Sequence, residues 1–348
     1  MSPDVFAKVL DRLTESDFVG EKISLVWHAG EPLALPISYY DELFEKIERF
    51  PSLVGKVTHS IQTNGMLIND AWCEFFRKHC VSVGVSIDGP EFINDVYRKD
   101  KRGRGTLQRV LKGVECLRRN KVDFHVIAVI TSGALDHAKE IFEFFVDLGV
   151  EHLGLNIEEK EGTNTSSSLE TRDTEEQVKA FFQTMYALQK QHENKLRIRE
   201  FDRAFRTIAS ADVARLETTL ELNDQVAPIK ILSVDCDGRF STFSPELLGM
   251  SDPEHGDFIF GNVLEDSFDS IWTRQNFITT LDEINKGVAK CKEKCEYFNF
   301  CGGGAPSNKL YENGTLDSAE TMYCKYTIQY PLDIVLCELE SQLLGEPA

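Results

Sequence analysis

Short apolar runs rich in β-branched residues alternate with longer amphipathic stretches over residues 3–157. This alternation predicts βα units that feed a parallel sheet. The predicted strands are Lys22–Trp27, Lys56–Gln62, Ser82–Ile87, Phe124–Thr131 and His152–Asn156. The predicted helices lie near Ser38–Arg49, Asp70–His79, Thr106–Asn120 and Asp136–Leu148, and several begin at Ser, Thr, Asp or Asn, which are good N-caps.

The first element has the pattern of a helix, with Ser2 as a suitable N-cap and Pro3 at the first helical position. A right-handed βα crossover joins each helix to a strand on both sides, so we expect a strand upstream of Met1 to be missing. The expected fold class is α/β, a partial (β/α)6 barrel over residues 1–195 that lacks its first strand.

The pattern changes in the second half of the chain. A helix is predicted over Thr174–His192, and residues 196–228 are expected to form bridging helices. Residues 229–348 contain a predicted strand at Ile229–Val234, many Gly- and Pro-punctuated loops and a last helix near Pro331–Leu344. We expect this part to be a small loop-rich domain organised around something other than a large apolar core.

The chain carries 38 Lys and Arg against 57 Asp and Glu, a formal net charge of −19. Such a field repels polyanions, so nucleic acid and acidic lipid surfaces are not expected as partners. No apolar run is long enough to span a bilayer, and residues 1–20 do not have the pattern of a signal peptide, so we expect a cytoplasmic protein. The acidic run at 158–161 is expected to be a solvated loop, with contact to a basic leader peptide as the alternative.

Five of the nine cysteines lie in the last sixty residues, and four of these form Cys291-x3-Cys295-x5-Cys301 with Cys324 downstream. Three glycines follow Cys301, and they allow the backbone to approach a bulky inorganic group. Four thiolates suit a tetrahedral zinc ion or a [4Fe-4S] cluster. Four buried free cysteines are the alternative without a metal.

Polar turns that contain glycine follow three of the predicted strands, at residues 28–32, 62–65 and 86–90. Because ligand sites of parallel α/β sheets form at the carboxyl ends of the strands, these turns are expected to converge on one cavity. Their backbone carbonyls can accept from a ligand amine, and their Ser, Asn and Asp side chains can hold ribose hydroxyls.

These motifs resemble a known family. The sequences Ala29-Gly30-Glu31-Pro32, Gln62-Thr63-Asn64-Gly65 and Ser86-Ile87-Asp88-Gly89-Pro90, with Arg98 and the terminal cysteines, resemble radical S-adenosylmethionine (SAM) enzymes that carry a SPASM domain. The resemblance covers essentially the whole chain. Residues 27–33 and 240–249 are most similar to the maturases that form cyclophane crosslinks in glycine-rich repeat precursor peptides.

The resemblance implies a role for each matching residue. Ala29, Gly30, Glu31 and Pro32 would line the methionine end of SAM, Ser86 and Asp88 would approach the ribose, Arg98 the carboxylate, and Gln62 and Asn64 the cavity floor. Cys291, Cys295, Cys301 and Cys324 would bind the auxiliary [4Fe-4S] cluster of the SPASM domain. Ala29 stands where the usual motif has its first glycine.

Two further departures from the family pattern affect the clusters. Thr242, Ala305 and a stretch without cysteine after Gly261-Asn262 stand where a second auxiliary cluster would have ligands, so we expect one auxiliary cluster. Cys236 is then an unassigned thiol or a substitute ligand. The chain also has no Cys-x3-Cys-x2-Cys, the triad that binds the SAM-reducing [4Fe-4S] cluster in the family. We expect that cluster only if a missing N-terminal segment is restored.

The implied activity is that of a radical SAM oxidoreductase, a maturase that installs a carbon–carbon, cyclophane-type crosslink on a ribosomal precursor peptide. The chain as printed is expected to be inactive. Its expected partners are the precursor peptide and an electron donor such as a flavodoxin or ferredoxin. Asp235, Asp237 and His28 are weak candidates for proton transfer, and a structural role is the alternative for His28.

Two other functions stay open: a non-catalytic peptide-binding protein and a zinc-stabilised interaction module. No Ser-His-Asp set, phosphate loop or HExxH motif supports a hydrolase or NTPase.

Overall fold

The computed structural model describes residues 1–17, 20–162, 164–209, 223–253 and 255–344. Its larger sheet has six parallel strands, and their spatial order follows the chain from β1 to β6. The strands are β1 Ile23–Trp27, β2 Val57–Thr63, β3 Ser82–Ser86, β4 Phe124–Ile130, β5 His152–Ile157 and β6 Arg197–Ile198. The five predicted strands are confirmed, and the sixth lies where only helix was expected.

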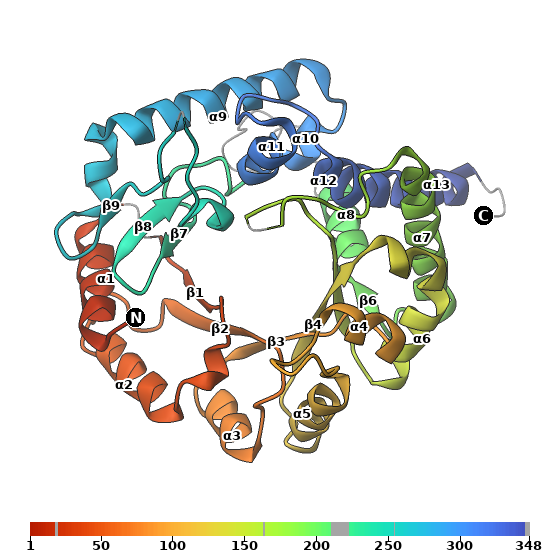
Figure 1. Cartoon of the computed structure of the whole chain (residues 1–348), viewed down its shortest axis with the longest axis horizontal. Coiled ribbons are helices and arrows are strands. Elements are labelled where there is room, and N and C mark those ends of the chain that lie inside the picture. Colours follow the sequence, from red (N-terminus) through yellow and green to blue (C-terminus); the bar gives the residue numbers. More distant parts are fainter. Residues whose placement is uncertain (18–19, 163, 210–222, 254, 345–348) are drawn as a thin grey trace.

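Helices cover one face of this sheet, which curves into an incomplete ring (Figure 1). They are α1 Pro3–Glu15, α2 Ile37–Glu48, α3 Asp70–Lys78, α4 Glu91–Tyr97, α5 Leu107–Arg119, α6 Ala138–Asp147, α7 Arg172–Gln191 and α8 Arg199–Ala209. Ser2 caps α1 as predicted, since its hydroxyl accepts from Val5 N–H at 3.2 Å. Asn69 caps α3 by accepting from Trp72 N–H at 3.1 Å.

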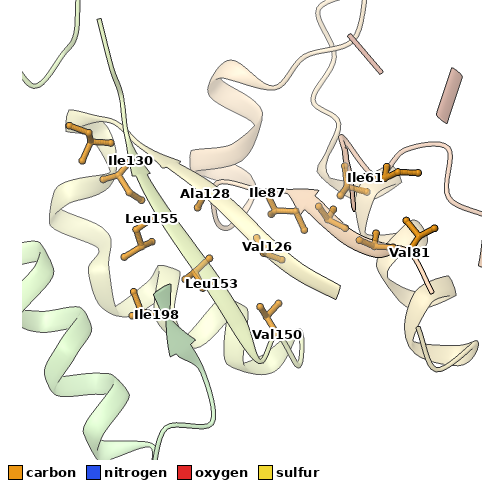
Figure 2. Close-up of a cluster of buried hydrophobic side chains, with 14 of the residues drawn as sticks. Ile61, Val81, Ile87, Val126, Ala128, Ile130, Val150, Leu153, Leu155 and Ile198 are labelled. Carbon is orange, nitrogen blue, oxygen red and sulfur yellow. The ribbon is translucent and has the colours of Figure 1, made fainter. Parts of the chain in front are cut away.

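The two faces of the sheet differ in chemistry because successive strand residues point to opposite sides. One face carries the buried aliphatic side chains of Figure 2, including Ile61, Val126, Leu155 and Ile198. The alternate positions include the polar residues Gln62, Ser86, His125 and Asn156, together with apolar residues such as Ile127. The sheet therefore has an apolar core on its helix side and a polar inner face.

The second part of the molecule has a small antiparallel sheet of β7 Leu232–Val234, β8 Arg239–Thr242 and β9 Gly261–Asn262. Its helices are α9 Gln275–Lys294, α10 Phe298–Cys301, α11 Pro306–Asn313, α12 Met322–Cys324 and α13 Tyr330–Leu344. A π-helical turn, Lys325–Gln329, joins the last two. The last helix is as predicted, whereas the strand begins at Leu232 rather than Ile229, whose φ of 65° is incompatible with a strand.

The expectation that this part lacks a large apolar core is wrong. Six phenylalanines are buried between the small sheet and α9: Phe240, Phe243, Phe258, Phe260, Phe268 and Phe277. The sequence places them singly among loop residues, so no periodic pattern marks them. Aromatic packing therefore stabilises this part in addition to whatever the cysteines bind.

The second part lies across the open side of the ring, from α1 to α7 and α8 (Figure 1). Arg12 Nε on α1 donates to Val263 O at 3.1 Å, and Lys190 on α7 pairs with Glu338 on α13 at 3.3 Å. Of the expected bridging helices over 196–228, residues 199–209 are helical, 197–198 form β6, and 210–222 lie outside the described residues. Within the described parts of the chain, a membrane-crossing helix is not found.

Candidate functional site

The turn after β1 contains two consecutive residues with positive φ. Ala29 and Gly30 have φ values of 68° and 64°, in the left-handed region that favours glycine. Ala29 therefore adopts a conformation costing roughly 1 kcal/mol for a residue with a Cβ, which explains why glycine is usual there. His28, Ala29 and Gly30 are exposed, whereas Pro32 is buried and its carbonyl accepts from Tyr40 OH at 3.0 Å.

Glu31 joins the turns after β1 and β2. Its Oε1 accepts from Leu33 N–H at 3.0 Å and from the Thr63 hydroxyl at 2.6 Å. Its Oε2 accepts from Asn64 N–H at 2.8 Å. The carboxylate thus holds the two turns in register, a positioning role that the sequence did not indicate.

Gln62 and Ser86 lie side by side on the inner face. Gln62 Nε2 donates to Ser86 Oγ at 2.9 Å, across the parallel pairing of β2 with β3. Gly84 provides the room, because an added Cβ would overlap Gln62 and lie 2.7 Å from His125 Nε2. Asn64 accepts from Met66 N–H at 3.0 Å through its own Oδ1. The structure therefore brings Gln62 and Ser86 together and fixes Asn64 in its turn.

Asp88 and Arg98 form an ion pair. Arg98 Nε donates to Asp88 Oδ2 at 2.6 Å, and its terminal nitrogen donates to Oδ1 at 2.7 Å. Asp88 is buried and also accepts from Val129 N–H at 2.9 Å. Both oxygens of Asp88 are thus already engaged within the protein, while Arg98 retains donors beyond this pair.

Several polar residues of the inner face were not identified from the sequence. His125 on β4 faces Gly84, and Arg199 at the end of β6 donates to Asn156 Oδ1 at 2.6 Å. Burial lowers the pKa of His125, and the nearby Arg199 and His152 lower it further. His125 sits in a strand whose apolar positions dominate the pattern, so only its inward-facing alternate position could have marked it, and Arg199 is the first residue of α8 and has no such signal.

A cavity of about 370 Å³ lies between the inner face and the second part of the molecule. The sheet side contributes Asn156, Glu159, Glu161, Arg199, Glu200 and Arg203, and the other side contributes Gln225, Glu246, Ser307, Asn308, Tyr323 and Thr327. The acidic run at 158–161 thus forms a wall of this cavity, and the prediction that it is a solvated loop is wrong.

Burial changes the acidity of the carboxyl groups in this wall. It raises the pKa of Glu159 to about 7, against the opposing effect of a hydrogen bond from Asn308 Nδ2 at 2.8 Å. Burial raises the pKa of Glu161 to about 8, and the charges of Glu159 and Glu246 add to the effect. Groups that titrate near neutral pH can accept or release a proton during a reaction.

The candidate metal ligands lie at helix ends, with Cys291 and Cys295 at the end of α9 and Cys324 at the end of α12. Cys295 ends α9 and its N–H donates to Cys291 O at 2.9 Å, so these two share one turn as predicted. Cys301 ends the short helix α10 rather than lying in a loop. Burial raises the pKa of the Cys291, Cys295 and Cys324 thiols, the last to about 11, and the nearby Cys301 sulfur adds to each shift.

In the part of the chain that the structure describes, no three His, Cys, Asp or Glu side chains are close enough to hold a single metal ion. Four cysteine thiolates are the donor set of a [4Fe-4S] cluster. The three glycines after Cys301 have φ values of 67°, 113° and 75°, so this backbone is specific to glycine. The donor set and the glycine turn fit a [4Fe-4S] cluster.

The remaining candidates lie apart from these features. Cys236 is an exposed thiol in the turn between β7 and β8. Among the described residues it makes no contact with the four cysteines. Asp235 accepts from the backbone of Asp237 and Arg239 at 2.9 and 3.0 Å, which makes it a turn residue. The Asp237 side chain is 72% exposed. These positions favour structural roles, and His28 is likewise exposed at the end of β1.

Comparison with known proteins agrees with the geometry. The family model for the radical SAM superfamily matches residues 1–145. An uncharacterized protein of Synechocystis sp. is 42% identical over 344 residues, which cover 98% of this chain and 85% of that protein.

More limited matches connect the chain to maturases. A serine-type anaerobic sulfatase-maturating enzyme of Klebsiella aerogenes is 39% identical over 132 residues, 38% of this chain and 33% of the enzyme. A cysteine-type enzyme of Clostridium perfringens strain 13 is 29% identical over 189 residues, 53% of this chain and 51% of the enzyme. The matched region therefore spans a third to a half of these two relatives.

Solved structures share the fold. Native anSMEcpe with bound AdoMet superimposes with a TM-score of 0.76 at 21% identity, over 98% of this chain and 90% of that one. Streptococcus suis SuiB bound to precursor peptide SuiA gives 0.64 at 14% identity, over 93% and 69%. By the family model, residues 1–145 belong to the radical SAM superfamily, and by the solved structures the whole chain shares the fold of anSMEcpe.

Proposed function

We propose that this protein is a maturase that modifies a side chain of a peptide, with SAM at the carboxyl ends of β1 to β3 and the peptide in the cavity. One observation carries the proposal: the cavity lies between the inner face of the sheet and the segment that contains Cys324. Asn156 and Arg199 of the wall belong to the inner face. On the opposite wall, Tyr323 immediately precedes Cys324.

Bound SAM with its reducing cluster would supply a radical able to take hydrogen from carbon, and an auxiliary cluster held by the four cysteines would supply an electron acceptor. The protein contributes position, exclusion of water and charge. Glu159 and Glu161, which titrate near neutral pH, are placed to hold a proton released by the substrate. Arg199 and Arg203 supply positive charge in the same cavity.

Within this proposal the product is a cyclophane, in which an unactivated side-chain carbon is bonded to an aromatic ring. The motifs at 27–33 and 240–249 support this product, and the fold shared with SuiB, which was solved bound to a precursor peptide, supports a peptide substrate. A flavodoxin or ferredoxin would reduce the SAM-binding cluster. Formation of the bond removes two hydrogen atoms from the peptide.

The test uses two anaerobically purified proteins, the 348-residue chain and a form extended upstream of Met1, because the chain itself holds no Cys-x3-Cys-x2-Cys. Each is given SAM, a reductant and a glycine-rich peptide with aromatic residues. We expect the extended form to cleave SAM and to yield a peptide lighter by two hydrogens, with fragmentation blocked between the linked residues. Absence of SAM cleavage by the extended form would instead support a peptide-binding protein.

A second candidate is maturation of a sulfatase, favoured by the named activity of the Klebsiella and Clostridium relatives. Co-production of the extended form with an anaerobic sulfatase separates the two functions. Gain of sulfatase activity, with no crosslink in the glycine-rich peptide, would assign this second function. Iron and zinc analysis of the same preparations decides between a cluster and a zinc-stabilised module.

A further inference from the structure

Lys309 is a buried cation next to a candidate cluster ligand. Lys309 lies on α11 and is only 2% exposed. Its Nζ is 3.5 Å from Cys291 Sγ. Among the residues that the structure describes, no carboxylate forms an ion pair with it. A thiolate at Cys291 is therefore the group available to balance this charge.

Glycines of two segments make room for the lysine. A Cβ added to Gly287 on α9 would lie 3.0 Å from Lys309 Nζ and would overlap the carbonyl of Leu316. A Cβ added to Gly304 would lie 3.5 Å from Lys309 Cε. The fold thus holds the end of this lysine against the sulfur in a narrow slot, rather than leaving it free to reach solvent.

Burial of an unpaired ammonium is strongly unfavourable unless an anion compensates it. Cysteine that binds iron does so as the thiolate, which is such an anion. A positive charge close to a cluster also stabilises the more negative, reduced form, and it acts with little screening in a buried site. A metallated cysteine set would supply the negative charge that compensates the buried Lys309.

We propose that Lys309 is a positioning residue of the auxiliary cluster, and that its charge raises the reduction potential of that cluster so that it accepts an electron from the oxidised substrate. The inference rests on the proposed function for the role of the electron. Its two structural elements, the cluster and the charge beside it, are testable without any peptide substrate.

The experiment compares wild type with Lys309→Met, which removes the charge at similar volume, and Lys309→Arg, which keeps the charge. Lys290→Met is the matched control, because Lys290 precedes Cys291 but is exposed and paired with Asp317. Iron and sulfide contents are measured after anaerobic reconstitution, followed by a potentiometric titration of the visible absorption. The 348 residues contain one such cysteine set, so the signal reports on one cluster.

We expect Lys309→Met to lower the equilibrium constant for reduction about tenfold or more, which is roughly 59 mV for one electron. Lys290→Met should shift the potential much less, and Lys309→Arg should remain near wild type. If Lys309→Met loses its iron, retention of iron in Lys309→Arg supports the charge requirement, and loss in both variants overturns it. An unchanged potential in Lys309→Met also overturns the inference. Wild-type protein that binds no iron refutes the cluster itself, a separate outcome from failure of peptide modification.

Discussion

Replacement of Glu31 tests whether this carboxylate organises the site or contacts a ligand. In the structure it accepts hydrogen bonds from Leu33 N–H at 3.0 Å, the Thr63 hydroxyl at 2.6 Å and Asn64 N–H at 2.8 Å. These bonds connect the turn after β1 to the turn after β2. Glu31→Ala removes all three, whereas Glu31→Gln keeps one oxygen and points an NH2 group at a donor.

The expected loss in free energy of unfolding follows from the number and kind of hydrogen bonds that Glu31 accepts. A hydrogen bond to a charged group contributes about 1.5–3 kcal/mol, and water can replace part of this because Glu31 is only partly buried. We therefore expect Glu31→Ala to lower the free energy of unfolding by about 2–4 kcal/mol, short of the sum of three full bonds. Glu31→Gln should cost about 1–2 kcal/mol, since one donor then faces another.

Urea denaturation measures the stabilities, and calorimetric titration with SAM measures binding by the folded variants. Glu45→Ala is the control, because Glu45 is exposed on α2, and such a surface change is expected to stay within about 0.5 kcal/mol. Wild-type stability of Glu31→Ala together with loss of SAM binding would refute the reasoning. That result would show that the carboxylate acts on the ligand instead of joining the turns.

Three other substitutions have defined outcomes. Asp88→Asn should lower the free energy of unfolding by about 2–4 kcal/mol, because Arg98 loses a bidentate carboxylate partner; urea denaturation that finds no loss would contradict the ion pair. Gly84→Ala should cost about 1–3 kcal/mol by displacing Gln62, again by urea denaturation, and a neutral result would show that the inner face has spare room. The pKa of Glu161 is raised in the folded state, so the fold binds its proton more tightly than the unfolded chain does. Stability from this group is full at acid pH and is lost as the pH rises from about 5 to about 8, and urea midpoints of Glu161→Gln should fall less than those of wild type over this window. Equal slopes would contradict this assignment.

The sequence was sufficient for β1 to β5 because apolar residues recur in these strands with period two, and they are buried in β2 to β5 and partly buried in β1. The sixth strand could not be predicted, since Arg197–Ile198 has only two residues and continues directly into a helix. Its pairing with β5 is a tertiary effect. The phenylalanines of the second part were visible as residues, but their common core depends on contacts between segments far apart in the chain.

The sequence predicted where the candidate site lies but not which of its side chains hydrogen-bond to one another. Glycine, proline and short polar residues after a strand mark a turn at the ligand-binding edge. They do not reveal whether a carboxylate there faces a ligand or a neighbouring turn, as Glu31 and Asp88 show. Lys309 carries no local signal, because a lysine on a short helix is usually solvated and only the fold shows that this one is buried.

The glycines of the inner face determine how a ligand would meet the sheet. Long polar side chains lie flat over these glycines: Gln62 and His125 over Gly84, and Arg199 over Gly154. Several of them already hold one another, as in the bond from Gln62 to Ser86. The polar side chains of this surface are therefore already held in place before a ligand binds. Binding of a ligand would then cost these side chains little rotamer freedom. Their dipoles would need little reorientation as charge develops on the ligand.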